Sequence, residues 1–558
     1  MPNTLWNVAF GLGILGCSSS SGAPAPRVDA GAADTARAAH DAARSADAPH
    51  SVDATKAPEA GEAGEAAAFT CATVQTAGGP VQGIVEGATC TYQGVPFAAP
   101  PVGPLRWKPP QPVMPWTTPR PSAPASACPQ VASVFGEAST SEDCLYLNVW
   151  APGGSAPHPR PVMVFVYGGG FVYGSATLPL YDATNLAHAT DNLVVTINYR
   201  LGALGFLSDP ALRAEDATVP TSGNYGLLDQ IAAFSWVKAN IAAFGGDPTK
   251  VTIFGESAGG SSMLVHLASP RSQGLFQRVI VESAFVANKA GAWPTSTADP
   301  IGSSFEAAVG CTDPSTLLTC LRAVPVATLL TASDNAEMGL AFNWRPVIDN
   351  VVLTEDLLPT LASGSFNPVP TLIGTNKNEG TLFASLSTPT DPTSYQAFAE
   401  TTFPGNGAAI VAQYPITSFG GSYFTAASEL LTDGGFVCPA RTVARAISAT
   451  EPVFRYDFVH AITSPVPNLG VFHGSELLFV FGNPDGAFGS LEASEQPLSA
   501  LVMGYWGSMA AAGNPKGDGR FSWPQYNTAT ETNLVLDLTP STETLLKETP
   551  CDFWDSLP

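Results

Sequence analysis

The chain has 558 residues, 45% of them hydrophobic and only 13% charged, and its formal net charge is −23 at pH 7. This acidic balance argues against a nucleic-acid partner, because phosphate backbones are bound by surfaces rich in Lys and Arg. No break in composition follows residue 69, so we expect one large folded domain over residues 69–558, and no apolar run in it is long enough to predict a membrane-spanning helix.

The N-terminus is typical of an export signal. Leu5–Gly16 is short and apolar, like the hydrophobic region of a signal peptide, and the run ends in ILGC at Cys17. This ending resembles the lipobox of bacterial lipoproteins, whose cysteine is acylated after cleavage, although no Lys or Arg precedes the apolar run. We expect a signal peptide over residues 1–17 and lipidation of Cys17, with a plain secretory peptide as the alternative.

Residues 18–68 are predicted to form a disordered spacer. From residue 22 they are almost entirely Ala, Gly, Pro, Ser, Asp and Glu with scattered Arg, and the first aromatic residue is Phe69. Such a segment cannot bury enough apolar surface to offset the entropy of ordering it, although its alanines permit transient helix. The spacer would separate a surface anchor from the folded domain.

The folded part alternates between strand-like and helix-like segments. Cys71–Tyr92 has alternating residues and Gly-rich turns, which predict an antiparallel hairpin at a sheet edge. Leu227–Phe244 has one apolar helical stripe and is followed by GGDP, which stops a helix. The runs expected as strands buried on both faces are Pro161–Tyr167, Leu193–Asn198, Val251–Phe254, Arg278–Val281 and Val369–Ile373. This order predicts an α/β fold with a large, mostly parallel central sheet and helices on both faces.

Three glycines, Gly168–Gly170, follow the first of these strands directly. An oxyanion hole needs backbone N–H groups with no side chain in the way, and a glycine run supplies them. A merely flexible loop is the alternative, but the flanking aromatic residues Tyr167 and Phe171 would hold the segment in place.

The most informative motif is GESAGG at residues 255–260. A strand-like run, Lys250–Phe254, precedes it, and the apolar residues of Ser261–Ala268 follow with helical spacing. In this context G-x-S-x-G is typical of a nucleophile elbow, because glycines on both sides permit a strained turn that raises one hydroxyl off the sheet at a helix N-terminus. Ser257 is therefore the candidate nucleophile, and a chance Gly-Ser turn is the alternative.

A serine nucleophile needs a histidine base, which an acid orients, and in α/β-hydrolases the acid and then the histidine follow the serine. Glu379 is the one carboxylate in the loop after the strand ending near residue 374, and an exposed loop acid is the alternative. His266 lies in the helix leaving the elbow and should point away from Ser257. His460 follows a strand-like run, and its alternative role is to cap the end of that strand. His473 is favoured as the base because the adjacent Gly474 gives the imidazole room to approach.

Cysteine usage indicates an oxidising compartment. An even number of cysteines in an exported chain predicts disulfides, and four bonds among eight cysteines allow 105 pairings. None of them stands in a CxxC or near a histidine at zinc-ligand spacing, so we expect no metal and no cofactor. Apart from Cys17, the cysteines are Cys71, Cys90, Cys128, Cys144, Cys311, Cys320, Cys438 and Cys551.

Taken together, these motifs resemble the type-B carboxylesterase family, which includes cholinesterases, fungal lipases and bacterial carboxylesterases. The resemblance runs from about residue 71 to 554. It implies an α/β-hydrolase fold, a triad of Ser257, Glu379 and His473, and oxyanion donors on Gly169, Gly170 and Ala258. The other matching segments are YQGVPFA (92–98), SEDCLYLNV (141–149), NYRLG (198–202), GNYGLLDQ (223–230), FGGDP (244–248) and HGSEL (473–477).

The same resemblance sorts the cysteines. It implies one bond within each of two short loops and one long C-terminal bridge. Cys71 and Cys90 remain, and they flank the predicted hairpin, so we expect them to pair across it. The pairs implied by the family are Cys128–Cys144, Cys311–Cys320 and Cys438–Cys551.

The expected activity is hydrolysis of a small carboxylic ester through an acyl-enzyme, with the acyl and alcohol groups and the oligomeric state left open. The loop from Cys128 to Cys144 has only 15 intervening residues and no tryptophan, so cholinesterase activity is not expected. Glu282 stands where the family often has Gln, which bears on substrate preference.

Two alternatives to a small-ester hydrolase remain. The first is an interfacial lipase, which needs a larger apolar lid than this chain offers. The second is a non-catalytic surface-binding protein on the same fold, which the complete triad disfavours. In each case we expect the protein outside the cytoplasm, as a lipoprotein on the outer surface or facing the periplasm, or secreted.

Overall fold

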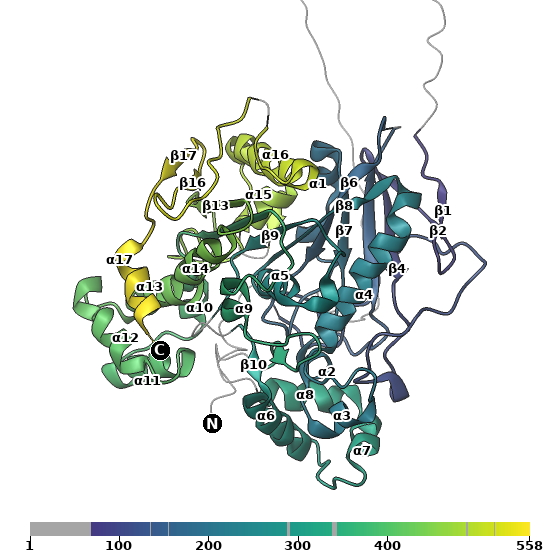
Figure 1. The fold of residues 1–558 in the computed structure, drawn as a ribbon, viewed down its shortest axis with the longest axis horizontal. Coiled ribbons are helices and arrows are strands. Elements are labelled where there is room, and N and C mark those ends of the chain that lie inside the picture. The colour runs from purple at the N-terminus through teal and green to yellow at the C-terminus, as the bar shows by residue number, and fades with distance from the viewer. Residues whose placement is uncertain are drawn as a thin grey trace, which may run out of the picture. The chain divides into compact units, whose positions relative to one another are not determined.

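The computed structural model describes residues 69–133, 135–154, 156–286, 291–336, 343–486, 489–517 and 519–557. The expected signal peptide, Cys17 and the spacer lie outside these residues. One sheet of 11 strands forms the centre of the described part (Figure 1). In spatial order it consists of β17 (Ser541–Glu543), β16 (Asn533–Leu536), β13 (Val453–Phe458), β12 (Thr371–Asn376), β9 (Arg278–Glu282), β8 (Gly246–Glu256), β6 (Arg160–Val166), β7 (Leu193–Ile197), β5 (Tyr146–Pro152), β4 (Thr89–Pro96) and β3 (Ile84–Glu86).

The seven strands from β16 to β7 run parallel, and β5, β4 and β3 add an antiparallel edge. The predicted mostly parallel sheet with an antiparallel N-terminal edge is therefore confirmed. The opposite edge also carries an antiparallel strand, β17, that the sequence did not predict. The strands β7, β12 and β13 are buried over their full length; β7 is almost wholly apolar, whereas β13 buries Arg455 and Asp457 among its apolar residues.

Helices cover the sheet. The helix α5 contacts β6, β8 and β9, and α16 contacts the same three strands, while α1 and α15 pack beside α16. The predicted helix at Leu227–Phe244 is α4 followed by a 3₁₀ turn at Ile241–Phe244, and Gly245 at φ 89° ends it. These sheet-covering helices are α1 (Thr184–Thr190), α4 (Tyr225–Asn240), α5 (Ala258–Ala268), α9 (Leu357–Ala362), α14 (Cys438–Ile447), α15 (Leu477–Phe481) and α16 (Gln496–Ala512).

One predicted strand is longer than expected. The prediction began at Val251, but β8 begins at Gly246, because Arg160 at the start of β6 already pairs with it.

The remaining helices and strands lie outside the central sheet and the helices named above. They are α2 (Gly202–Phe206), α3 (Pro210–Glu215), α6 (Thr295–Ala308), α7 (Leu317–Ala323), α8 (Val326–Ala336), β1 (Thr73–Gln75), β2 (Pro80–Gln82), β10 (Trp293–Pro294), β11 (Val347–Ile348), β14 (Asp485–Gly486) and β15 (Gly489–Ser490).

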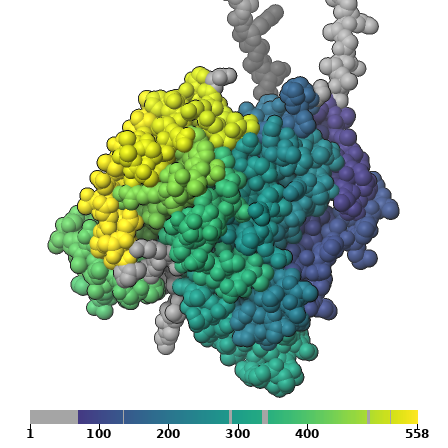
Figure 2. Space-filling view, viewed as in Figure 1, coloured from purple at the N-terminus to yellow at the C-terminus, as the bar shows by residue number. Residues whose placement is uncertain are grey.

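A second, helical core lies beside the sheet. It gathers buried residues such as Tyr395, Phe403 and Trp554, and Figure 2 shows the C-terminal residues, in yellow, against the green helices. A π-helical segment, Thr432–Val437, joins this core to α14. The helices that form it are α10 (Gly380–Leu386), α11 (Pro392–Thr402), α12 (Gly407–Gln413), α13 (Tyr423–Leu431) and α17 (Glu548–Ser556).

Four disulfides cross-link the described chain, and they join the cysteine pairs expected from the sequence. The longest loop is closed by Cys438–Cys551, which fastens α17 to α14 across 113 residues. Arg441 of α14 reinforces this junction through ion pairs with Glu531 (2.8 Å) and Asp552 (2.9 Å). Cross-links of this kind restrict the unfolded chain and are worth about 2–4 kcal/mol each. The other bonds are Cys71–Cys90, Cys128–Cys144 and Cys311–Cys320.

The disulfides are typical of extracellular or secreted proteins, because the cytoplasm keeps most thiols reduced. In the described ranges we find no helix that combines the length and the apolar character needed to cross a bilayer.

Candidate active site

Ser257 occupies a sharp turn between β8 and α5. Its φ of 59° and ψ of −121° place it in a backbone region that L residues rarely adopt, as a nucleophile elbow requires. Glycine is needed on both sides: a Cβ on Gly255 would lie 2.6 Å from the Val166 carbonyl oxygen, and one on Gly259 would lie 1.9 Å from it. The GESAGG motif therefore folds as predicted, with Ser257 at the N-terminus of a buried helix.

Ser261 fixes the elbow to the next strand. Its hydroxyl donates to the carbonyl oxygen of Ser257 (3.2 Å) and to that of Phe285 (3.0 Å). The backbone N–H of Ser257 donates to the carbonyl oxygen of Glu282 in β9 (3.0 Å). These bonds hold a strained backbone in a single conformation, which lets the serine keep its orientation.

Glu379 and His473 meet at the carboxyl ends of two neighbouring parallel strands. Glu379 follows β12, and His473 lies in the connection between β13 and α15. The imidazole Nδ1 lies 2.6 Å from Glu379 Oε2, and the other carboxylate oxygen accepts a 2.7 Å hydrogen bond from the backbone N–H of Asn376. Both side chains are buried, so this contact fixes which way the ring faces.

The second ring nitrogen of His473 faces the elbow. His473 Nε2 lies 3.1 Å from Glu256 Oε1 without hydrogen-bond geometry, and within the described residues no hydrogen bond joins it to the Ser257 hydroxyl. Such bonds are often long in free enzymes and tighten when substrate is bound. The rings of Phe383 and Phe436 lie against the imidazole, each with its centroid at 4.9 Å.

Two buried glutamates, Glu256 and Glu379, contact this imidazole, and two more, Glu282 and Glu476, interact with them; sequence reasoning did not foresee this cluster. Burial lowers the pKa of His473, but the negative charges of Glu256 and Glu379 outweigh it, so the pKa lies above its usual value. Burial raises the pKa of Glu256 to about 7 despite the opposing charge of His473, and it raises that of Glu282 to about 8. Burial with neighbouring carboxylates also raises the pKa of Glu476 well above its usual range. These raised pKa values mean that carboxyl groups of the site hold protons near neutral pH.

Glu282 and Glu476 reach the cluster in different ways. Glu282 is paired in register with Glu256 on the adjacent parallel strand, and the side chain of Trp506 partly offsets the rise that burial causes in the pKa of Glu282. Glu476 accepts a short hydrogen bond from the Asn376 amide and a 3.4 Å bond from the Ser283 hydroxyl. The signal for Glu476 was its place in the HGSEL segment, three residues after His473.

The glycine loop after β6 is shaped by close backbone contacts. Gly169 has φ 98°, and a Cβ there would lie 2.4 Å from the Tyr173 carbonyl oxygen. The carbonyl of Gly169 accepts from the N–H groups of Val172 (3.1 Å) and Tyr173 (3.0 Å), which closes a tight turn. The backbone N–H groups of Gly169, Gly170 and Ala258 donate to no described residue and so can serve a ligand.

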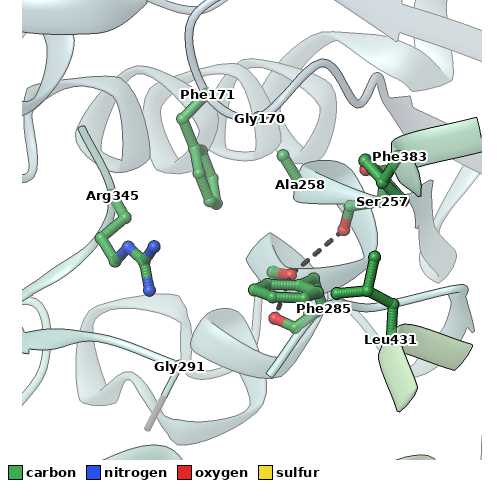
Figure 3. Close-up of a pocket in the computed structure, with 10 residues that line it drawn as sticks. Gly170, Phe171, Ser257, Ala258, Phe285, Gly291, Arg345, Phe383 and Leu431 are labelled. Atoms are coloured by element: carbon green, nitrogen blue, oxygen red, sulfur yellow. Dashed lines mark hydrogen bonds between the residues drawn. The ribbon is translucent and has the colours of Figure 1, made fainter. Parts of the chain in front are cut away.

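A pocket with about 590 Å³ of empty space opens in front of Ser257 (Figure 3). Aromatic and aliphatic side chains form most of its wall, as is typical of small-molecule sites. The lining residues are Gly170, Phe171, Ser257, Ala258, Ser261, Phe285, Gly291, Arg345, Phe383 and Leu431.

The other two candidate histidines lie elsewhere. His266 is buried in α5 between Gln230 (2.7 Å) and Ser272 (2.9 Å), and burial lowers its pKa to about 3. His460 contacts Asp537 and Glu495, each at 2.8 Å. Neither lines the pocket, and in the described part of the chain no three His, Cys, Asp or Glu side chains converge as a metal site.

Comparison with known proteins identifies relatives over almost the whole described chain. Residues 70–554 match the carboxylesterase family. The cocaine esterase of Oryctolagus cuniculus is 36% identical, with 83% of this chain and 90% of the relative covered. The fumonisin B1 esterase of Sphingopyxis macrogoltabida is 36% identical over 81% and 84%, and the para-nitrobenzyl esterase of Bacillus subtilis (strain 168) is 36% identical over 83% and 94%.

Solved structures agree with the sequence relatives. A thermophilic PNB esterase superposes with a TM-score of 0.78 at 33% identity, covering 87% of this chain and 100% of that one. Family match, fold and pocket lead to one conclusion. The chain belongs to the carboxylesterase family, with an α/β-hydrolase fold and the activity of a carboxylic ester hydrolase.

Proposed function

We propose that Ser257, His473 and Glu379 are the nucleophile, general base and orienting acid of this ester hydrolase. The observation that carries the proposal is the 2.6 Å contact between Glu379 and His473 Nδ1, which turns the other ring nitrogen towards the elbow that carries Ser257. Serine hydrolases use this arrangement, in which an acid contacts the imidazole and the imidazole faces the serine.

In this mechanism His473 removes the proton from Ser257 as the hydroxyl attacks the ester carbonyl. The carbon becomes tetrahedral, and its oxyanion is bound by the backbone N–H groups of Gly169, Gly170 and Ala258. His473 then gives the proton to the leaving alcohol, which leaves an acyl group on Ser257. A water molecule repeats the cycle and releases the acid.

A serine-reactive fluorophosphonate tests the nucleophile directly. We expect one equivalent to react, and peptide mass spectrometry to find it on Ser257 and not on the neighbouring Ser261 or Ser283. Ser261 is the internal control for reactivity, because it lines the same pocket but its hydroxyl donates a hydrogen bond to the backbone of the elbow. Labelling of another serine in folded protein would overturn the assignment.

We also propose that the catalytic domain, residues 69–558, is tethered to a membrane through acylated Cys17 and a flexible spacer over residues 18–68. The support is the lipobox-like ILGC and the spacer composition. A flexible coil of about 50 residues spans roughly 35–40 Å. Cys17→Ala should move active enzyme from the membrane fraction to the soluble fraction or block its processing, and an unmodified mature N-terminus beyond Cys17 would contradict the tether.

A further inference from the structure

The short disulfide loop from Cys128 to Cys144 reaches the glycine loop through one side chain. Gln130 lies in the disulfide loop and is buried, with 2% of its surface exposed. Its amide Nε2 donates to the carbonyl oxygen of Gly174 (2.8 Å), and its Oε1 accepts from the backbone N–H of the same glycine (2.9 Å). The side chain therefore binds both polar backbone groups of one residue, shortly after the glycine run.

Gln130 is itself fixed by the disulfide loop. Its backbone N–H and carbonyl group pair with the carbonyl group and N–H of Ser139, each at 2.9 Å. Its Nε2 also donates to the carbonyl oxygen of Cys128 (3.2 Å), and the bond from Cys128 to Cys144 closes the loop. A side chain held in this way can restrict the backbone that it binds.

Gly174 lies directly against the start of the glycine run. Its φ is 121°, and a Cβ there would lie 2.4 Å from the ring of Tyr167 and 3.0 Å from the carbonyl oxygen of Gly168. The peptide unit is planar, so the position of the Gly168 carbonyl sets the direction of the Gly169 N–H. Holding Gly174 therefore restricts the peptide unit that carries one of the oxyanion donors.

The direction of the Gly170 N–H depends on the same turn. The carbonyl group of Gly169 accepts from the N–H groups of Val172 (3.1 Å) and Tyr173 (3.0 Å). In a trans peptide the C=O and N–H point in opposite directions, so these bonds turn the Gly170 N–H away from the interior of the turn. Gly174 is the next residue along the chain, and Gln130 holds the turn at this end.

We propose that Gln130 is a positioning residue for the oxyanion hole, which keeps the N–H groups of Gly169 and Gly170 aligned by binding Gly174. This inference rests on the proposed roles of Ser257 and of these donors, and it adds a residue that does not line the pocket in front of the serine. Misaligned donors bind the transition state less well but hardly change the binding of the ester itself.

The test uses Gln130→Met, which keeps most of the side-chain volume and removes its hydrogen bonds. The substrate is para-nitrophenyl pentanoate, and the inhibitor is trifluoromethyl n-butyl ketone, which has the same butyl chain. Ser257 Oγ adds to the ketone carbon, the serine proton passes to His473, and the ketone oxygen becomes an oxyanion like that of the transition state. We expect kcat to fall about 10- to 100-fold with KM almost unchanged, and the ratio of the inhibition constant Ki to KM to rise by about the same factor.

A matched control separates positioning from a general loss of stability. Asn224 is buried, and its amide binds both backbone groups of Val347 (2.7 and 2.9 Å) in the same manner, but neither residue lines the pocket. Asn224→Leu should lose comparable stability and keep the wild-type ratio of Ki to KM. The acid limb of the kcat/KM profile should keep its midpoint in Gln130→Met, because no charge beside His473 changes.

Gln130→Glu decides the question if Gln130→Met fails to fold. The carboxylate still accepts from the N–H of Gly174 but has no amide hydrogens to donate, so its ratio of Ki to KM should lie between those of wild type and Gln130→Met.

The outcomes separate this proposal from the assignment of the nucleophile. An unchanged ratio of Ki to KM in Gln130→Met, or in Gln130→Glu if only that variant folds, would overturn the role of Gln130. An equal rise in Asn224→Leu, or a shifted acid limb in Gln130→Met, would place the damage outside the oxyanion hole and would also overturn it. Wild-type affinity of Ser257→Ala for the ketone would instead overturn the proposed function.

Discussion

The two walls of the pocket are built in different ways. The reacting wall stands on the central sheet: Ser257 follows β8, Glu379 follows β12, and Gly169 follows β6, and short hydrogen bonds fix their positions. The rest of the lining comes partly from elements outside the sheet, with Arg345 just before β11 and Leu431 at the end of α13. The difference teaches that the proposed catalytic residues are positioned by a rigid scaffold, whereas the rest of the pocket lining is positioned partly by packing between peripheral segments.

The most severe way to break the reacting wall is Ser257→Ala. It removes only a hydroxyl, so the free energy of unfolding should hardly change, while ester hydrolysis should fall on the order of a million-fold in kcat. Steady-state kinetics beside a thermal melt measure both effects. More than a few per cent of wild-type activity in pure, folded protein would refute the nucleophile.

The base is tested by a pair of histidine variants. His473→Ala should match Ser257→Ala in kcat, because the two groups act as a unit. His460→Ala is the control, since His460 binds Asp537 and Glu495 away from the pocket. That variant should lose at most about 1–3 kcal/mol of stability and keep its catalysis. A dead His460→Ala with an active His473→Ala would reverse the assignment.

Glu256→Gln tests how the charges beside His473 set the pKa of this histidine. The carboxylates of Glu256 and Glu379 stabilise the imidazolium and hold the pKa of His473 above its usual value. Because the base works only when neutral, activity should rise as pH increases through this pKa. Removing one negative charge lowers the pKa of His473, so the acid limb of the kcat/KM profile should move to lower pH. A shift to higher pH, or none, would contradict this account.

Glu282→Gln should have the smallest effect on catalysis and a visible one on stability. Burial raises the pKa of Glu282 from 4.5 to about 8, so the folded protein keeps a proton that the unfolded chain has lost, and stability falls as pH rises between these values. Gln mimics the neutral acid at every pH. The variant should match wild type near pH 4 and exceed it by about 5 kcal/mol above pH 8 in denaturant titrations. Equal stability at both pH values would show that Glu282 is not held neutral.

Local sequence patterns predicted the strands and the turn at Ser257 well, but they did not predict the cluster of buried glutamates. The strands at residues 161–167 and 193–198 and the turn at Ser257 have signals within a few neighbouring residues, and the structure reproduces them. It also brings Glu379 and His473 together, as chain order led us to expect, while their catalytic roles stay a proposal. Glu282 was noted only as a departure from the Gln that the family often has, because its pairing with Glu256 joins two strands that meet only in three dimensions.

The packing of the last helix, α17, has a consequence for folding. Trp554 lies over Gly434, where an added Cβ would be 2.3 Å from its ring, and two residues later Phe436 packs against the imidazole of His473. Helix α17 thus packs against the segment that supports the imidazole of His473, and the Cys438–Cys551 disulfide fixes the helix to α14. A chain that ends before α17 lacks this support. We therefore expect full activity only after α17 has been synthesised and Cys438 and Cys551 have paired in an oxidising environment.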